Sequence, residues 1–132
     1  MQFQQQISFL IVSDMKRSRD FYEVILGLEL VHVQPSGCRI LKVNDGAYLG
    51  ICDHRRPDQS AISKDNTILC LVDQDVDGWA TRLKEMNVVI EKGPIQHEKF
   101  DIYHIFFRDP DGYLVEIQRF NNSDWFSSEK NT

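Results

Sequence analysis

The stretch "FFRDPDGYLVEIQ", residues 106–118, decides the fold because it fixes a hairpin and the register of its two strands. The central "DPDG" (109–112) has the residues of a type I turn followed by a bulged glycine, with proline at position i+1 and glycine at positive φ. This turn places Phe106 opposite Glu116. Cross-strand neighbours share one face of a sheet, so the register sorts the side chains of both strands into two sets.

One predicted face is almost entirely apolar and must lie under cover, which the two predicted helices can provide. This face consists of Tyr103, Ile105, Phe107, Val115 and Ile117. The other face is mixed and consists of Ile102, His104, Phe106, Arg108, Leu114, Glu116 and Gln118. A sheet face open to water usually carries fewer apolar side chains. The mixed face therefore indicates a small-molecule pocket, with a plain solvated surface as the alternative.

The elements around this hairpin occur twice along the chain. The first half predicts a strand, a helix that begins after Asp14 and ends at Gly27, and three strands, the last two joined by "NDG". The second half repeats the order, with Asp75 and Asn87 at the two helix ends. The expected strands are 7–12, 28–33, 38–43, 47–52, 67–72, 88–92, 102–108 and 113–119, and the expected helices are 15–26 and 76–86.

The chain thus reads as an α+β fold of two βαβββ modules, at about 6–53 and 66–119, within one domain of 132 residues. The polar stretch 53–66 is the expected linker, and 120–132 is a polar tail in which Trp125 and Phe126 can contact a neighbouring subunit.

Composition excludes several classes of protein. A formal net charge of −5 argues against binding to nucleic acid, which needs a basic face. No apolar run approaches the roughly 20 residues that span a bilayer, and the N-terminal residues lack the pattern of a signal peptide. Three cysteines without a CxxC spacing predict reduced thiols and a cytoplasmic protein, with Cys70 as a small buried hydrophobe.

The duplicated βαβββ order, together with "VSDMKRSRDFYEVILGLEL" (12–30) and "FFRDPDGYLVEIQ", resembles the vicinal oxygen chelate superfamily. That group includes glyoxalase I, extradiol dioxygenases, fosfomycin-resistance enzymes and bleomycin-resistance proteins. The resemblance covers residues 6–119. It implies mixed, curled sheets around a cavity, helices outside them, and a cleft often completed in a homodimer. It does not specify one activity.

Metal-dependent members of this superfamily take ligands from the first strand of each half and from the last strand of each half. The resemblance places these four positions at Ile7, Thr67, Gly50 and Glu116. A transition metal needs three or four N, O or S donors at about 2.0–2.3 Å. Only Glu116 matches, so we expect no metal and no other cofactor. A divalent metal would need a non-standard set that includes residues such as His104 or Cys52.

The remaining candidates surround Glu116. His104 lies diagonally from it on the mixed face, and an imidazole beside a carboxylate can act as a general acid or base. A structural histidine is the alternative. Arg108 can bind an anionic ligand, pair with Glu116 or lie in water. The expected ligand-binding walls are Phe106, Tyr48, Phe9, Ile7 and Thr67. His32, His54 and His97 are interpreted as ordinary polar surface, and Trp79 as core or interface.

Two functions fit this pattern. The first is a metal-independent protein that binds a small, flat or aromatic ligand in a homodimeric cleft. The second is a lyase or isomerase that acts either without metal, through His104 and Glu116, or with a non-standard metal set. An accessory domain with a protein partner is a third possibility. Nucleic acid and membranes are not expected as partners.

Overall fold

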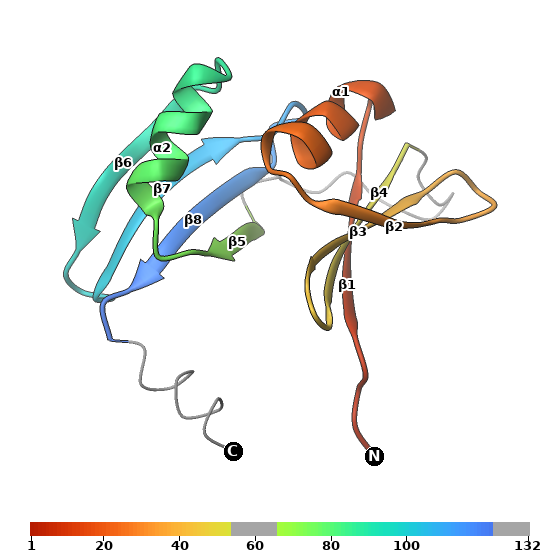
Figure 1. Cartoon of the computed structure of the whole chain (residues 1–132), viewed down its shortest axis with the longest axis horizontal. Coiled ribbons are helices and arrows are strands. Elements are labelled where there is room, and N and C mark those ends of the chain that lie inside the picture. Colours follow the sequence, from red (N-terminus) through yellow and green to blue (C-terminus); the bar gives the residue numbers. More distant parts are fainter. Residues whose placement is uncertain (54–65, 123–132) are drawn as a thin grey trace. The chain divides into compact units, whose positions relative to one another are not determined.

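The computed structural model describes residues 1–53 and 66–122 of the chain, which divides into two compact units, Met1–Ile62 and Ser63–Thr132 (Figure 1). Each unit combines one four-stranded sheet with one helical segment. Most of the predicted linker, 53–66, lies outside the described residues, as do Trp125 and Phe126 of the predicted tail.

The first unit has the strand order β1-β4-β3-β2, with β1 parallel to β4 and the other pairs antiparallel. Its elements are β1 (Gln6–Ile11), α1 (Met15–Arg19), η1 (Asp20–Ile25), β2 (Glu29–Val33), β3 (Arg39–Asn44) and β4 (Ala47–Cys52). The single helix predicted at 15–26 is two segments, because the second one widens into a π-helix. The amide of Leu26 there donates to the carbonyl of Phe21, five residues earlier.

The ends of this helical segment are those predicted. The side chain of Asp14 accepts from the amide of Arg17 at 3.2 Å, and Gly27 has a φ of 74°. The carboxylate of Glu23 accepts two hydrogen bonds of 3.0 Å from the guanidinium of Arg39. This bidentate pair joins η1 to β3 and orients the helical segment on the sheet.

The second unit repeats the arrangement with the strand order β5-β8-β7-β6. Its elements are β5 (Ile68–Val72), α2 (Val76–Glu85), β6 (Ile90–His97), β7 (Ile102–Arg108) and β8 (Leu114–Phe120). Asp75 caps α2 by accepting from the amide of Gly78 at 2.9 Å, and Asn87 has a φ of 63°. The equivalent order of the two sheets confirms the predicted pair of βαβββ modules.

One strand of the second unit is longer than predicted. The sequence indicated a strand at 88–92, whereas β6 continues to His97. Gly93 and Pro94 are unfavourable inside a regular strand. The structure accommodates them in an irregularity of the β6–β7 pairing between Lys92 and Ile95. The extension carries His97 onto the sheet.

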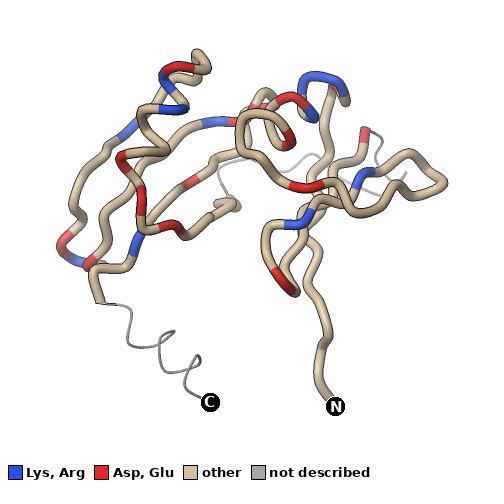
Figure 2. Tube along the Cα trace, in the orientation of Figure 1, with Lys and Arg blue, Asp and Glu red and all other residues tan. Residues whose placement is uncertain are grey.

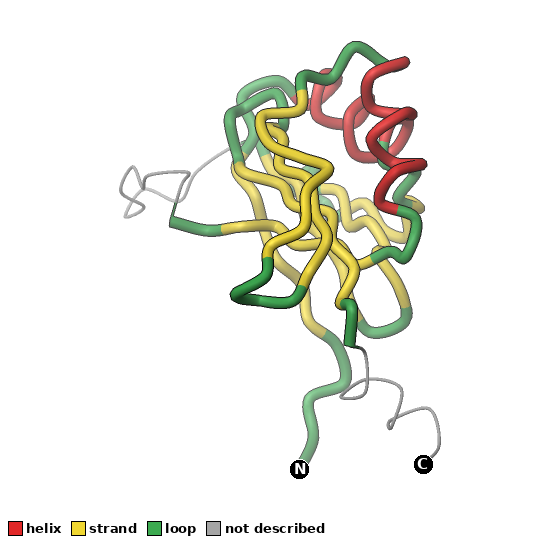
Figure 3. The backbone as a smooth tube through the Cα atoms, turned by 90° about the vertical axis from the view of Figure 1, so that its left-hand side faces the viewer, coloured by secondary structure: helices red, strands yellow, loops and turns green. Residues whose placement is uncertain are grey.

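The register predicted for the last hairpin is confirmed, since Phe106 pairs with Glu116 and Phe107 with Val115. The carboxylate of Asp109 holds the turn by accepting from the amides of Asp111 and Tyr113, each at 2.9 Å. The apolar face is enclosed, as predicted, at Ile105, Phe107, Val115 and Ile117. Helix α2 covers this face and leaves the mixed face on the opposite side of the sheet (Figures 1 and 3).

Two expectations about cysteine are wrong. Cys38 and Cys52 form a disulfide between the residue preceding β3 and the end of β4, so these two thiols are not reduced. Cys70 is exposed on β5, because it lies on the mixed face and not on the face under α2. Strand alternation decides this placement, which the apolar composition around Cys70 could not show.

Basic and acidic residues are interspersed along the traced chain of both units (Figure 2). No helix in the described parts of the chain is long and apolar enough to cross a membrane.

Candidate functional site

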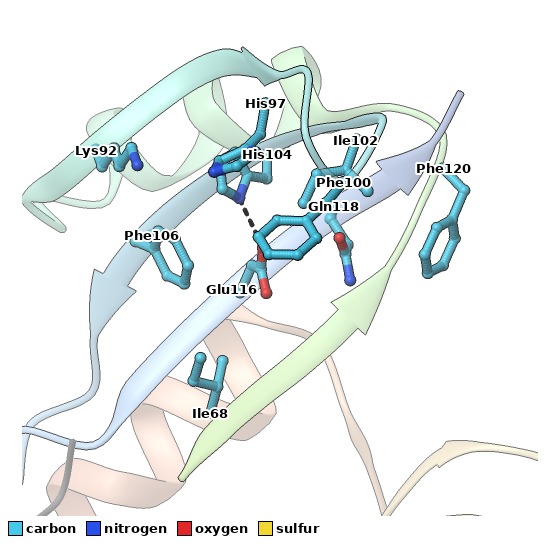
Figure 4. Close-up of a pocket in the computed structure, with 10 residues that line it drawn as sticks. All are labelled: Ile68, Lys92, His97, Phe100, Ile102, His104, Phe106, Glu116, Gln118 and Phe120. Atoms are coloured by element: carbon cyan, nitrogen blue, oxygen red, sulfur yellow. Dashed lines mark hydrogen bonds and ion pairs between the residues drawn. The ribbon is translucent and has the colours of Figure 1, made fainter. Parts of the chain in front are cut away.

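A pocket of about 470 Å³ lies on the mixed face of the second unit (Figure 4). Residues of β5, β6, β7 and β8 and of the β6–β7 turn surround it. They are Ile68, Lys92, His97, Phe100, Ile102, His104, Phe106, Glu116, Gln118 and Phe120. Strand alternation brings the even-numbered residues of β7 and β8 to this face. The predicted hairpin register therefore included Ile102, His104, Phe106, Glu116 and Gln118 among the residues of this face.

The most enclosed polar pair of the pocket is His104 and Glu116. Nδ1 of His104 lies 2.6 Å from Oε2 of Glu116, and the two side chains are 3% and 10% exposed. His104 pairs along the strands with Gln118, and Glu116 pairs with Phe106, so the two residues are diagonal neighbours as predicted. Because a carboxylate only accepts hydrogen bonds, Nδ1 carries the hydrogen of this contact.

The other ring nitrogen of His104 has a different environment. Nε2 is enclosed and has no hydrogen-bond partner among the described residues. In an imidazole whose Nδ1 is held by a carboxylate, Nε2 points away from that carboxylate. The contact with Glu116 therefore fixes the orientation of the His104 ring in the wall of a largely apolar pocket.

His97 is a pocket residue that the sequence reasoning missed. Its ring stacks on Phe100 with centroids 4.7 Å apart and meets the ring of His104 edge to face at 5.8 Å. Its Nδ1 is also enclosed without a partner among the described residues. The interpretation of His97 as polar surface followed from ending the strand at residue 92. The alternation of Ile95 and His97 opposite His104 and Ile102 is the signal that could have placed it.

Aromatic rings form the walls of the pocket. The ring of Phe106 meets that of His104 at 5.0 Å, and Phe100 and Phe120 contribute the other phenyl groups. Figure 4 shows Phe100 and Phe106 beside the His104–Glu116 contact and Phe120 farther along, beyond Gln118. Aromatic walls with few polar groups suit a flat organic molecule.

Cys70 is a neighbour of Glu116, because the two residues pair in the parallel ladder of β5 and β8. The side-chain amide of Gln118 donates to Sγ of Cys70 at 2.8 Å. Desolvation of the sulfur, and after it the charge of the nearby Glu116, raise the pKa of the Cys70 thiol to about 11. The thiol is therefore protonated at neutral pH and is a poor nucleophile.

Arg108 does not line this pocket. Its guanidinium donates to Oε1 of Glu91 and to the carbonyl of Gly112, both at 3.1 Å. The expected roles in binding an anionic ligand or pairing with Glu116 thus have no support in its position. The cation that does line the pocket is Lys92 on β6.

Three of the expected wall residues belong to the first unit. Ile7 and Tyr48 line a smaller pocket there, of about 280 Å³, together with Gln5, Val31, His32, Gln34 and Ile40. Phe9 lies over Gly50, where an added Cβ would clash with the phenyl ring. A side chain at position 50 would therefore require the ring of Phe9 to move.

The pocket position expected at Thr67 is held by the next residue, Ile68. Thr67 precedes β5 and is exposed, whereas Ile68 lines the pocket. The ladders show the correct correspondence. Ile7 pairs with Tyr48 two residues before Gly50, and Ile68 pairs with Leu114 two residues before Glu116. Ile68 is thus the counterpart of Ile7, and Gly50 is the counterpart of Glu116.

A family model for the Glyoxalase/Bleomycin resistance protein/Dioxygenase superfamily matches residues 4–117. The chain therefore belongs to this superfamily. A comparison with curated proteins finds no match.

Solved structures share the fold. The structure of TnmS3, an antibiotic binding protein from Streptomyces sp. CB03234, is 25% identical with a TM-score of 0.74, covering 89% of this chain and 95% of that one. A glyoxalase/bleomycin resistance protein from the same organism is 28% identical with a TM-score of 0.66, covering 86% and 97%. Lactoylglutathione lyase from Agrobacterium tumefaciens is 23% identical with a TM-score of 0.66, covering 86% and 90%.

The metal site implied by the metal-dependent members of the superfamily does not fit these residues. With the register of the ladders, its four positions are held by Ile7, Ile68, Gly50 and Glu116. Only Glu116 has a side chain that can donate to a transition metal. Among the described residues, no group of three or more His, Cys, Asp and Glu side chains is arranged to hold a metal ion.

Proposed function

We propose that this protein binds a small, flat aromatic molecule, without a metal, in the pocket of its second unit. The observation that carries the proposal is the combination of aromatic walls with a single oriented polar pair, His104 and Glu116. The superfamily contains proteins that bind and proteins that catalyse. The absence of three of the four donor side chains favours the binding reading for this chain.

The pocket has the size and chemistry for this role. Its volume of about 470 Å³ lies within the range of roughly 300–1,000 Å³ that is typical of small-molecule sites. Similarity to TnmS3, an antibiotic binding protein, supports the same reading. Binding would be driven by burial of the aromatic plane, and the polar pair would set the orientation of the ligand.

The decisive experiment replaces a pocket residue by a larger one, which occupies the pocket and leaves the His104–Glu116 pair in place. Ile68 lines the pocket and is 47% exposed, whereas Val72 lies on the same face of the same strand, is 49% exposed and is not part of the lining. We expect Ile68→Trp to abolish binding of naphthyl methyl ether in equilibrium dialysis and Val72→Trp to leave it unchanged. Failure of the unmodified protein to bind both this ether and the parent β-naphthol, or equal effects of the two variants, would overturn the proposal.

A second candidate function is favoured by the geometry of the polar pair. A carboxylate that holds Nδ1 of an imidazole leaves Nε2 placed to take a proton from a substrate, as a metal-free lyase or isomerase requires. The test is hydrogen exchange in D₂O at the methyl group of methyl naphthyl ketone, followed by NMR. Faster exchange with the unmodified protein than with His104→Gln would support catalysis. Equal rates would leave only the binding function.

A further inference from the structure

We propose that the ligand of this pocket carries an aromatic hydroxyl group that donates a hydrogen bond to Nε2 of His104. The inference rests on the proposed binding function and names the class of ligand: a phenol or a larger hydroxyarene. It follows from the tautomer that Glu116 selects and from the rings that surround the imidazole.

Glu116 selects the tautomer of His104. The carboxylate of Glu116 can only accept, and its 2.6 Å contact with Nδ1 of His104 fixes the hydrogen on that nitrogen. In the neutral ring, Nε2 then has a lone pair and no hydrogen. A group that satisfies Nε2 must therefore be a donor.

No residue in the described parts of the chain donates a hydrogen bond to Nε2 of His104. His104 is 3% exposed, and Nε2 has no partner among the described residues. Buried polar atoms in folded proteins are nearly all hydrogen-bonded. An enclosed acceptor in a pocket wall, held in one orientation by a carboxylate, is a site that a bound molecule can complete.

Aromatic rings surround the imidazole of His104. The rings of His97 and Phe106 both contact the ring of His104 edge to face. Phe100 stacks on His97 but is 62% exposed, so few contacts hold it there. A flat ring that displaces Phe100 would stack on His97, whose ring contacts that of His104. The same displacement would have to open access to the enclosed Nε2 of His104.

The charge of Lys92 favours a hydroxyl over a cationic donor in the ligand. Lys92 is the cation among the lining residues. Its charge would repel an ammonium group in the ligand, whereas it would stabilise the partial negative charge on a phenol oxygen that donates its hydrogen. An aromatic hydroxyl therefore fits both the acceptor on His104 and the charge of Lys92.

The experiment compares β-naphthol with its methyl ether, which has the same rings and oxygen but lacks the hydrogen. We expect the unmodified protein to bind β-naphthol roughly tenfold more tightly in equilibrium dialysis, because the ether leaves Nε2 without a donor. In His104→Phe both probes should bind alike. His32→Phe, the same substitution in the pocket of the first unit, should keep the preference.

A spectroscopic measurement on the unmodified protein covers the case in which His104→Phe does not fold. The ¹⁵N resonance of His104 Nε2 should be that of an unprotonated nitrogen, and β-naphthol should shift it while the ether does not. If both probes bind equally, or the ether binds more tightly, the inference fails and the proposed function stands. If neither probe binds, the proposed function fails and this inference fails with it.

Discussion

Nδ1 of His104 and Oε2 of Glu116 lie 2.6 Å apart between neighbouring strands, and both side chains are almost fully enclosed. The pair joins one carboxylate oxygen to one ring nitrogen, and the second ring nitrogen, Nε2, has no hydrogen-bond partner among the described residues. Such a pair is costly to disrupt on one side only, because the remaining partner stays buried without its contact.

Replacement of Glu116 tests how much this contact stabilises the fold. Glu116→Leu leaves the Nδ1–H of His104 buried and unpaired, so we expect the free energy of unfolding to fall by about 1–3 kcal/mol. Glu116→Gln retains an acceptor of similar shape and should lose less. Urea unfolding at neutral pH measures both. Equal losses in the two variants would show that the hydrogen bond to His104 does not stabilise the fold.

Ile105 and Phe106 are neighbours on β7 that face opposite sides of the sheet. Ile105 is fully enclosed under α2, so Ile105→Ala should lower the free energy of unfolding by about 2–5 kcal/mol. Phe106→Ala should lower it less and should weaken binding of the naphthyl probe more. Urea unfolding and equilibrium dialysis provide the two readouts. The opposite ranking in either assay would contradict the assignment of the two faces.

The reactivity of Cys70 should report the charge of Glu116. A thiol pKa of about 11 means little thiolate at pH 7 to 8, and the alkylation rate should rise with pH up to about 11. Glu116→Gln removes a charge that raises this pKa, so the rate near pH 8 should increase. Iodoacetamide labelling followed by mass spectrometry measures the rate at Cys70. A rate unaffected by Glu116→Gln would show that the two groups do not interact.

Metal content is a separate prediction. Because Ile7, Ile68 and Gly50 hold three of the four ligand positions of metal-dependent relatives, we expect the purified protein to contain far less than one transition-metal ion per chain after dialysis. Elemental analysis is the measurement. About one Zn, Ni, Mn or Fe per chain would contradict the prediction and would favour the catalytic reading.

Assembly into a homodimer stays a prediction. Exposed sheet edges and apolar side chains such as Phe9 and Val72 favour cover by a second copy, and two-fold dimers are the commonest assemblies. Sedimentation velocity at micromolar concentration should give the mass of two chains. A single species at the mass of one chain, 15.4 kDa, would refute it.

The sequence determined the features that depend on residues close together in the chain. Asp14 and Asp75 cap helices, Gly27 and Asn87 end them, and the turn at 109–112 sets the register of β7 and β8. These signals are local because a cap or a tight turn is made by a few consecutive residues. The duplicated order of elements followed from them, and with it the fold.

Only the tertiary structure decided the features that depend on pairing between distant strands. The register of β5 against β8 places Ile68 in the pocket, where the sequence had indicated Thr67. The strand β6 continues through an irregular segment, so His97 lies beside His104. The guanidinium of Arg108 donates to Glu91, and Cys38 forms a disulfide with Cys52. These contacts depend on the register between strands that are distant in the chain, and a one-residue shift in strand pairing moves every side chain to the other face.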